Sequence, residues 1–159
     1  MGTISRKEKN LNSGTVTQMC GCMAEDTQIL MADGSQRYIS DLRMGERIMQ
    51  PETHRPILVQ NTWKGWEKQL ILIQTVKGNA VMLTKEHPVY QGNGFIRADE
   101  LKEGDTVYGE EGQKITVVSI AEVSYDGYVY NMDLQEDGGS SILLANGIVV
   151  GDMQVQNRM

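Results

Sequence analysis

The chain has 159 residues and a formal net charge of −6. This length is enough for one domain with its own core, and the acidic balance lacks the basic footprint that nucleic-acid binding usually requires, so no nucleic-acid partner is expected. The sequence contains neither an apolar run as long as a membrane span nor the apolar core of a secretory signal, so no membrane partner is expected either.

Residues 1–20 are predicted to be a flexible N-terminal flank. They contain Ser, Thr, Asn, Gly and a basic cluster of Arg6, Lys7 and Lys9, with almost no apolar periodicity. A segment of this composition cannot bury enough apolar surface to order itself. The folded domain is therefore expected over residues 21–152, followed by a C-terminal flank at 153–159.

From residue 21 onward, short apolar runs alternate with turn signals, which is typical of all-β proteins. Their β-branched content and their length favour strands over helices, and helical structure is expected only in two short turns. The apolar runs include residues 70–73, 80–83, 115–118 and 148–150. The turn signals include Asp33-Gly34, Asn93-Gly94, Asp126-Gly127 and Gly138-Gly139.

An internal repeat is the sharpest clue to the architecture. Residues 39–48 and residues 98–107 share a leucine, a glycine and an aliphatic residue at a constant offset of 59 positions: Leu42, Gly45 and Ile48 against Leu101, Gly104 and Val107. Each copy predicts a hairpin, one helical turn packed by its leucine, a glycine able to adopt positive φ, and a new strand. A generic β-barrel with a coincidental repeat is the alternative.

Three motifs follow one another in a fixed order. A cysteine comes directly after a glycine at Gly21-Cys22, and the stretch CMAEDTQI continues to Ile29. A histidine stands three residues after a threonine, at Thr84 and His87. The third motif is the Ala-Asn-Gly run at 145–147, whose following strand ends at Asp152.

In their order and spacing these motifs resemble the Hint (hedgehog/intein) superfamily, and most closely a B-type bacterial intein-like domain. The matching stretch from Cys22 to Asp152 spans 131 residues, about what a minimal intein without an inserted endonuclease needs. The resemblance implies an all-β horseshoe of two intertwined halves, related by a pseudo-twofold axis, with both chain ends meeting in a central cleft.

The resemblance also implies that the domain processes itself. Cys22 would attack the carbonyl of Gly21 in an N-to-S acyl shift, assisted by Thr84 and His87. The resulting thioester would be opened by water or by an external thiol or amine. Such a reaction is a single turnover on the flanking host polypeptide in cis, and it needs no cofactor and no metal.

The residue types suit this chemistry. Gly21 presents no side chain to obstruct attack, while the thiol of Cys22 is mostly protonated at neutral pH and needs activation. His87 has a side chain of near-neutral pKa that can protonate the departing amide nitrogen, and Thr84 would hold the geometry of the bond. The alternatives are that Cys22 is a small buried apolar residue and that His87 is structural.

Cys20 and Cys22 are the two cysteines of the chain, so no disulfide framework is available. A disulfide between them would close a strained small ring, and reduced thiols in a reducing, cytoplasmic environment are expected. A zinc site formed by these cysteines with His54 and His87 is not favoured, because structural zinc sites usually show two separated ligand pairs. His54 is expected to be a solvated loop residue.

The C-terminal motif departs from the intein pattern. Inteins usually end in a His-Asn pair whose asparagine cyclises, and Gly151 and Asp152 occupy the equivalent positions. Ser141 stands where a histidine is often found, and Asn131 where many inteins carry an aspartate. Asn157 could be a displaced cyclising residue, but no Cys, Ser or Thr follows it. N-terminal autocleavage with impaired C-terminal reaction is therefore predicted; splicing through Asp152 or Asn157 and a catalytically silent Hint module are the alternatives.

Overall fold

The structure is a computed structural model that describes residues 6–9, 15–16, 21–135 and 141–159. Most of the regular structure in these residues is β-strand, which confirms the predicted all-β class. The strands are β1 (Arg6–Lys9), β2 (Thr15–Val16), β3 (Met23–Ala24), β4 (Gln28–Leu30), β5 (Gln36–Tyr38), β6 (Arg47–Met49), β7 (Pro56–Thr75), β8 (Ala80–Leu83), β9 (Pro88–Tyr90), β10 (Phe95–Arg97), β11 (Thr106–Tyr108), β12 (Lys114–Leu134), β13 (Ile142–Ala145) and β14 (Ile148–Gly151). Two 3-10 turns, η1 (Ile39–Asp41) and η2 (Ala98–Glu100), and one helix, α1 (Met153–Arg158), complete the described elements.

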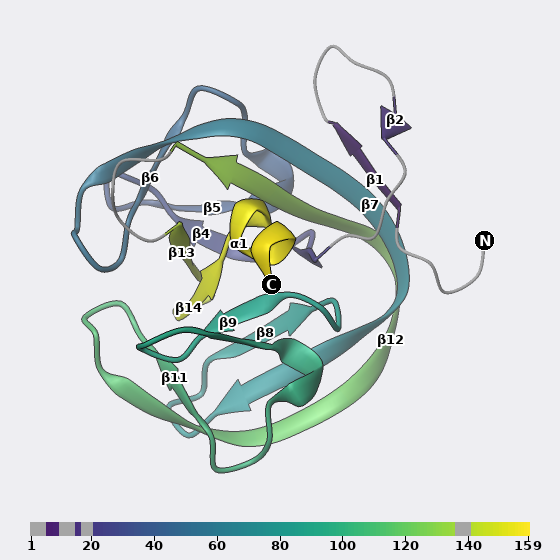
Figure 1. Cartoon of the computed structure of the whole chain (residues 1–159), viewed down its shortest axis with the longest axis vertical. Coiled ribbons are helices and arrows are strands. Elements are labelled where there is room, and N and C mark those ends of the chain that lie inside the picture. The colour runs from purple at the N-terminus through teal and green to yellow at the C-terminus, as the bar shows by residue number, and fades with distance from the viewer. Residues whose placement is uncertain (1–5, 10–14, 17–20, 136–140) are drawn as a thin grey trace.

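Two long strands form the outer band of the molecule (Figure 1). β7 and β12 pair antiparallel from Thr75 opposite Val117 to Val59 opposite Leu134, and their curvature gives the horseshoe outline. The register shifts between Ser124 and Gly127, where a bulge interrupts the pairing. The predicted turn at Asp126-Gly127 is therefore wrong: pairing with β7 continues on both sides of the bulge, so the chain does not reverse there.

The strand pairing brings distant parts of the chain together. Within the described residues, one sheet runs in the order β11-β12-β3-β8-β7-β1-β2, with β6 also pairing with β7. The other runs in the order β10-β9-β14-β13-β4-β5. Because β3 lies beside β8 and β14 lies beside β9, the three sequence motifs converge between the sheets.

The internal repeat is present in the backbone. Gly45 and Gly104 both have left-handed φ values, 96° and 92°, which glycine adopts without steric cost. In the first copy the N–H of Gly45 donates to the carbonyl of Val59 at 2.9 Å; in the second, Gly104 donates to Val117 at 2.8 Å. The aliphatic residues of both copies are buried in one core cluster: Leu42, Ile48, Leu101 and Val107. The long strand after one copy pairs with the long strand after the other, as the predicted pseudo-twofold arrangement requires.

Both flanks contain regular structure that the sequence analysis did not predict. β1 pairs with β7 and β2 pairs with β1, while the remaining residues of segment 1–20 lie outside the described residues. The two predicted helical turns are present as η1 and η2, and one further helix that was not expected, α1, follows directly after Asp152. This helix lies in the middle of the curved band (Figure 1). No helix among the described residues is long and apolar enough to cross a membrane.

Candidate active site

Thr84 holds the backbone of Cys22 from two directions. Met23 in β3 pairs with Leu83 in β8, so the residues next to this pair, Cys22 and Thr84, lie side by side. The N–H of Cys22 donates to Thr84 Oγ1 at 2.8 Å, and the N–H of Thr84 donates to the carbonyl of Cys22 at 2.9 Å. Both residues are buried. The peptide nitrogen of the Gly21–Cys22 bond is thus fixed by a side chain that the sequence predicted.

His87 reaches the same region through a tight turn. Its N–H donates to the carbonyl of Thr84 at 3.1 Å, and its fully buried ring places Nε2 3.0 Å from the carbonyl oxygen of Gly151. A carbonyl can only accept, so Nε2 carries the proton and Nδ1 presents its lone pair. Nδ1 is buried and has no hydrogen-bond partner among the described residues.

Burial decides the charge state of His87. It lowers the pKa of the imidazole from 6.5 to about 4, and the backbone groups of Gly21 and Gly151 raise this pKa by less than burial lowers it. The near-neutral pKa that was expected for His87 from the sequence is therefore wrong, and the ring is neutral at neutral pH. A neutral imidazole with a bare Nδ1 can first accept a proton and then donate it.

Asn131 contacts the other side of the peptide bond. Its Nδ2 donates a hydrogen bond to the carbonyl oxygen of Gly21, and its Oδ1 accepts from the N–H of Met132 at 2.8 Å. The residue lies in β12, opposite Trp63 of β7, and is buried. Asn131 stands where many inteins carry an aspartate, and it was not among the site residues predicted from the sequence.

The two candidate C-terminal residues lie in different environments. Asp152 is buried and is the N-cap of α1: its Oδ1 accepts from Val155 N at 3.1 Å and its Oδ2 accepts from Leu134 N at 2.9 Å. Burial raises the pKa of this carboxyl to about 6, with the hydrogen bonds opposing the rise. Asn157 is exposed on α1. The geometry thus gives Asp152 a structural role and separates Asn157 from the buried site.

The sulfur of Cys22 is engaged in a disulfide bond. The expectation of a reduced thiol is therefore wrong for this structure. The chain contains one other cysteine, Cys20, which lies outside the described residues. A disulfide sulfur has no thiolate to offer, so Cys22 must be reduced before it can attack a carbonyl.

His87 and Asp152 make opposite contributions to the pH dependence of stability. The pKa of Asp152 is raised on folding, so its contribution is present below its ordinary value of 3.8 and is lost as the pH rises to about 6. The pKa of His87 is lowered, so its contribution is present above 6.5 and is lost as the pH falls to about 4. The two effects offset each other between these limits.

We therefore expect Asp152→Asn to reveal the acid sensitivity that His87 causes. Asparagine keeps an oxygen that can cap α1 but does not titrate, so the free energy of unfolding should fall by roughly 2–3 kcal/mol between about pH 6.5 and about pH 4. The protein with Asp152 should change much less over this interval. Urea unfolding at several pH values, with Cys22→Ala in both proteins to prevent cleavage, measures the difference. Parallel pH curves would contradict the assignment of the two opposing groups.

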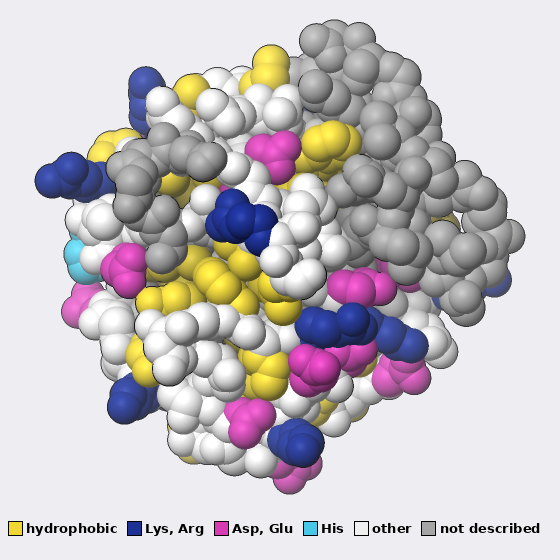
Figure 2. Space-filling view, viewed as in Figure 1, with side chains coloured by type: hydrophobic (Ala, Val, Ile, Leu, Met, Phe, Trp, Pro, Cys, Tyr) yellow, Lys and Arg dark blue, Asp and Glu magenta, His cyan; other side chains and the backbone are white. Residues whose placement is uncertain are grey.

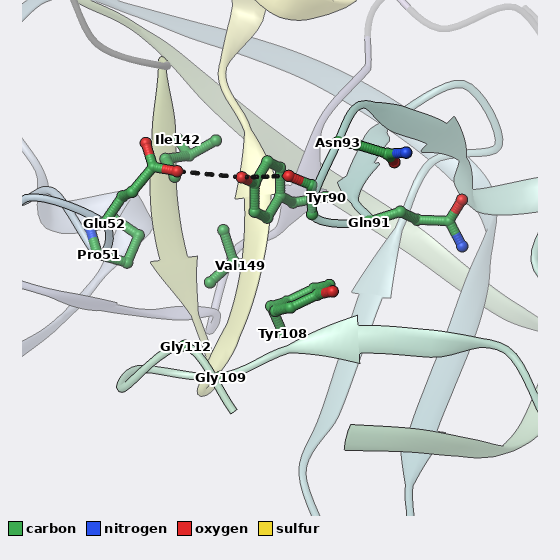
Figure 3. Close-up of a pocket in the computed structure, with 11 residues that line it drawn as sticks. Pro51, Glu52, Tyr90, Gln91, Asn93, Tyr108, Gly109, Gly112, Ile142 and Val149 are labelled. Carbon is green, nitrogen blue, oxygen red and sulfur yellow. Dashed lines mark hydrogen bonds between the residues drawn. The ribbon is translucent and has the colours of Figure 1, made fainter. Parts of the chain in front are cut away.

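A surface pocket lies away from the scissile bond. Hydrophobic side chains gather on one face of the molecule beside α1 (Figure 2), and the pocket there has a volume of about 480 Å³ (Figure 3). Tyr90, Tyr108, Ile142 and Val149 form its apolar walls, and Glu52 at its edge accepts a hydrogen bond from the Tyr90 hydroxyl at 3.1 Å. Cys22, Thr84 and His87 are not among its lining residues, so this pocket is separate from the candidate reaction centre.

Comparisons with known proteins confirm the predicted Hint superfamily and its fold. Residues 29–138 match the family described as the pretoxin HINT domain. Among solved structures, the chain is similar to the gp41-1 intein, with a TM-score of 0.73 and 21% identity over 84% of this chain and 99% of that one. It is also similar to a bacterial intein-like domain from Clostridium thermocellum, with a TM-score of 0.71 and 24% identity over 85% of this chain and 100% of that one.

One curated protein gives a partial sequence match. The DNA-directed RNA polymerase subunit Rpo1N of Methanocaldococcus jannaschii is 32% identical over 98 residues, which cover 56% of this chain. The match spans only 7% of the length of that subunit. The similarity therefore concerns one segment of the polymerase subunit and implies nothing about polymerase activity.

Proposed function

Because this chain belongs to the pretoxin HINT domain family and has the fold of the self-processing inteins, we propose that it cleaves the Gly21–Cys22 bond by an N-to-S acyl shift. One observation carries the proposal: a side chain from β12 and a side chain from the residue after β8 form hydrogen bonds with the two ends of this single peptide bond. Asn131 Nδ2 donates to its carbonyl oxygen, and Thr84 Oγ1 accepts from its N–H. A donor at the carbonyl is placed where negative charge develops during attack.

The first step joins the reduced sulfur of Cys22 to the carbonyl carbon of Gly21. The thiol proton passes to Nδ1 of His87, and Asn131 stabilises the negative charge on the former carbonyl oxygen. The carbon–nitrogen bond then breaks, and the proton moves from His87 to the departing nitrogen of Cys22. The product is a thioester between Gly21 and the side chain of Cys22.

The thioester then accepts a nucleophile. Water, an external thiol or an amine attacks the carbonyl carbon of Gly21, and the sulfur of Cys22 leaves with a proton. With water, the products are a fragment that ends in the Gly21 carboxylate and a fragment that begins with Cys22. The family description names a pretoxin, so we propose a toxin precursor as the flanking polypeptide in cis.

We further propose that the C-terminal reaction is impaired. Both carboxylate oxygens of Asp152 accept backbone hydrogen bonds, which hold the side chain in its capping position and away from attack on its own carbonyl. Asn157 is exposed and outside the buried site. Cleavage at the N-terminal side, without ligation of the flanks, is the outcome that this arrangement favours.

Intact mass spectrometry of the purified protein tests the acyl shift. The protein should stay whole without reductant, because the disulfide blocks the sulfur of Cys22. A phosphine reductant, which is not a thiol nucleophile, should permit slow hydrolysis. Adding dithiothreitol to the phosphine should accelerate the appearance of a fragment that begins at Cys22, because the thiol captures the thioester.

Two cysteine variants serve as the matched pair for this experiment. Cys22→Ala should remain full length under every condition, whereas Cys20→Ala should cleave, because Cys20 departs with the N-terminal fragment and takes no part in the proposed steps. Cleavage of Cys22→Ala at the same bond, or an intact reduced protein with both cysteines, would rule out the mechanism. A ligated product would instead support splicing.

A further inference from the structure

The C-terminal helix packs against the proposed cleavage site. Met153 at the start of α1 is fully buried in a cluster with Cys22, Leu70 and Val129. The helix is held in place by its N-cap, since Asp152 Oδ1 accepts from Val155 N and the Asp152 carbonyl accepts from Gln156 N at 3.2 Å. The last described segment of the chain thus lies over the bond where the domain begins.

Gln156 occupies the space that a side chain at position 21 would need. A Cβ atom placed on Gly21 would lie 2.7 Å from Cγ of Gln156 and 3.4 Å from its Cδ. It would also lie 3.3 Å from Cα of His87. Carbon atoms in favourable contact are about 3.5–4.0 Å apart, so the contact with Cγ cannot exist without movement.

The backbone of Gly21 does not itself demand glycine. Its φ lies outside the left-handed region, in contrast to residues such as Gly45 and Gly104. A left-handed φ therefore does not exclude alanine at this position. The requirement for glycine at this position therefore comes from the atoms that surround it. Of the three nearest atoms, two belong to the side chain of Gln156 and one to the backbone of His87.

Gln156 has little freedom to withdraw. Its Oε1 is buried and has no hydrogen-bond partner among the described residues, so this end of the side chain is enclosed by protein atoms. The preceding residue, Val155, is buried and packs so closely on Gly151 that a Cβ there would lie 2.9 Å from Cβ of Val155. Movement of Gln156 by shifting α1 would disturb this second close contact.

We propose that Gln156 is a specificity-determining residue that restricts the position before Cys22 to glycine. The inference rests on the proposed cleavage and names its substrate class: host segments that end in glycine. The C-terminal helix thereby selects which N-terminal flanks the domain accepts. Larger residues before Cys22 would push Gln156 and His87 out of position and slow the acyl shift.

A set of four reduced proteins tests the proposal by their cleavage rates in dithiothreitol. Gly21→Ala should slow cleavage by about tenfold or more where Gln156 is present, because overpacking displaces the site. In the Gln156→Ala background, the same change should slow cleavage by less than about twofold. The matched control is Asn157→Ala, the exposed neighbour on the same helix, which should give no relief.

A stability measurement separates this proposal from the proposed cleavage. In proteins that also carry Cys22→Ala and cannot cleave, Gly21→Ala should lower the melting temperature, and Gln156→Ala should remove most of that loss. Equal effects of Gly21→Ala with and without Gln156, in both rate and melting temperature, would overturn the role of Gln156. Coupled melting temperatures with no cleavage of the reduced Gly21 protein would overturn the proposed function and with it the selection of substrates.

Discussion

Replacing His87 with asparagine is expected to slow cleavage of the Gly21–Cys22 bond by about 10²–10⁴-fold, the usual range for loss of a general acid–base group. The proposed steps use Nδ1 of His87 twice, first to accept the thiol proton and then to protonate the departing nitrogen. Asparagine places its carboxamide near the position of Nδ1 and cannot exchange a proton near neutral pH, while the contact of Nε2 with the Gly151 carbonyl is lost. Time courses of fragment formation in dithiothreitol, quantified by intact mass, measure the rate.

His54 supplies the matched control. It is the other histidine of the chain, lies in an exposed turn and is separate from Thr84 and Cys22. Its backbone φ of 57° is one that asparagine tolerates well, so His54→Asn should fold and cleave at the unaltered rate. A His87→Asn protein that keeps a normal melting temperature and cleaves as fast as His54→Asn would remove His87 from the mechanism.

Much of the fold could be predicted because its signals are local or repeated. The apolar run at 80–83 coincides with β8, and the repeated leucine and glycine positions coincide with η1, η2 and the turns after them. Strand composition and positive-φ glycines act over a few residues, so they are visible in the sequence. The turn predicted at Asp126-Gly127 does not form, because long-range pairing of β12 with β7 overrides the local turn preference of these two residues.

The parts that could not be predicted depend on contacts between distant residues. Asn131 is 110 residues from Gly21 in the sequence, and only the pairing of β12 with β3 carries its amide to that carbonyl. α1 is too short to be stable from propensity alone and forms because Asp152 caps it and Met153 and Val155 find buried positions. The local relation between Thr84 and His87 follows from their spacing of three residues, since the N–H of His87 donates to the Thr84 carbonyl; their catalytic roles stay a prediction.

The role of Asn131 leads to the second large effect. Asn131→Ala removes the donor from the Gly21 carbonyl, and loss of one such donor slows comparable acyl transfers by about 10²–10³-fold. The effect should fall on fragment formation, while binding of reductant and thiol is unaffected because neither contacts this side chain in the proposed steps. Time courses under the same reduced conditions measure it.

Asn61→Ala is the control that separates a catalytic donor from a general loss of polar contacts. Asn61 lies in β7 and its Nδ2 also makes a hydrogen bond, at 3.3 Å, but to the carboxylate of Asp133 and not to the scissile carbonyl. Its removal should lower stability modestly and leave the rate within about twofold. If both alanine variants slow cleavage equally after their melting temperatures are taken into account, Asn131 acts through the fold. A selective loss in Asn131→Ala means that the donor stabilises the charge that develops on the Gly21 oxygen.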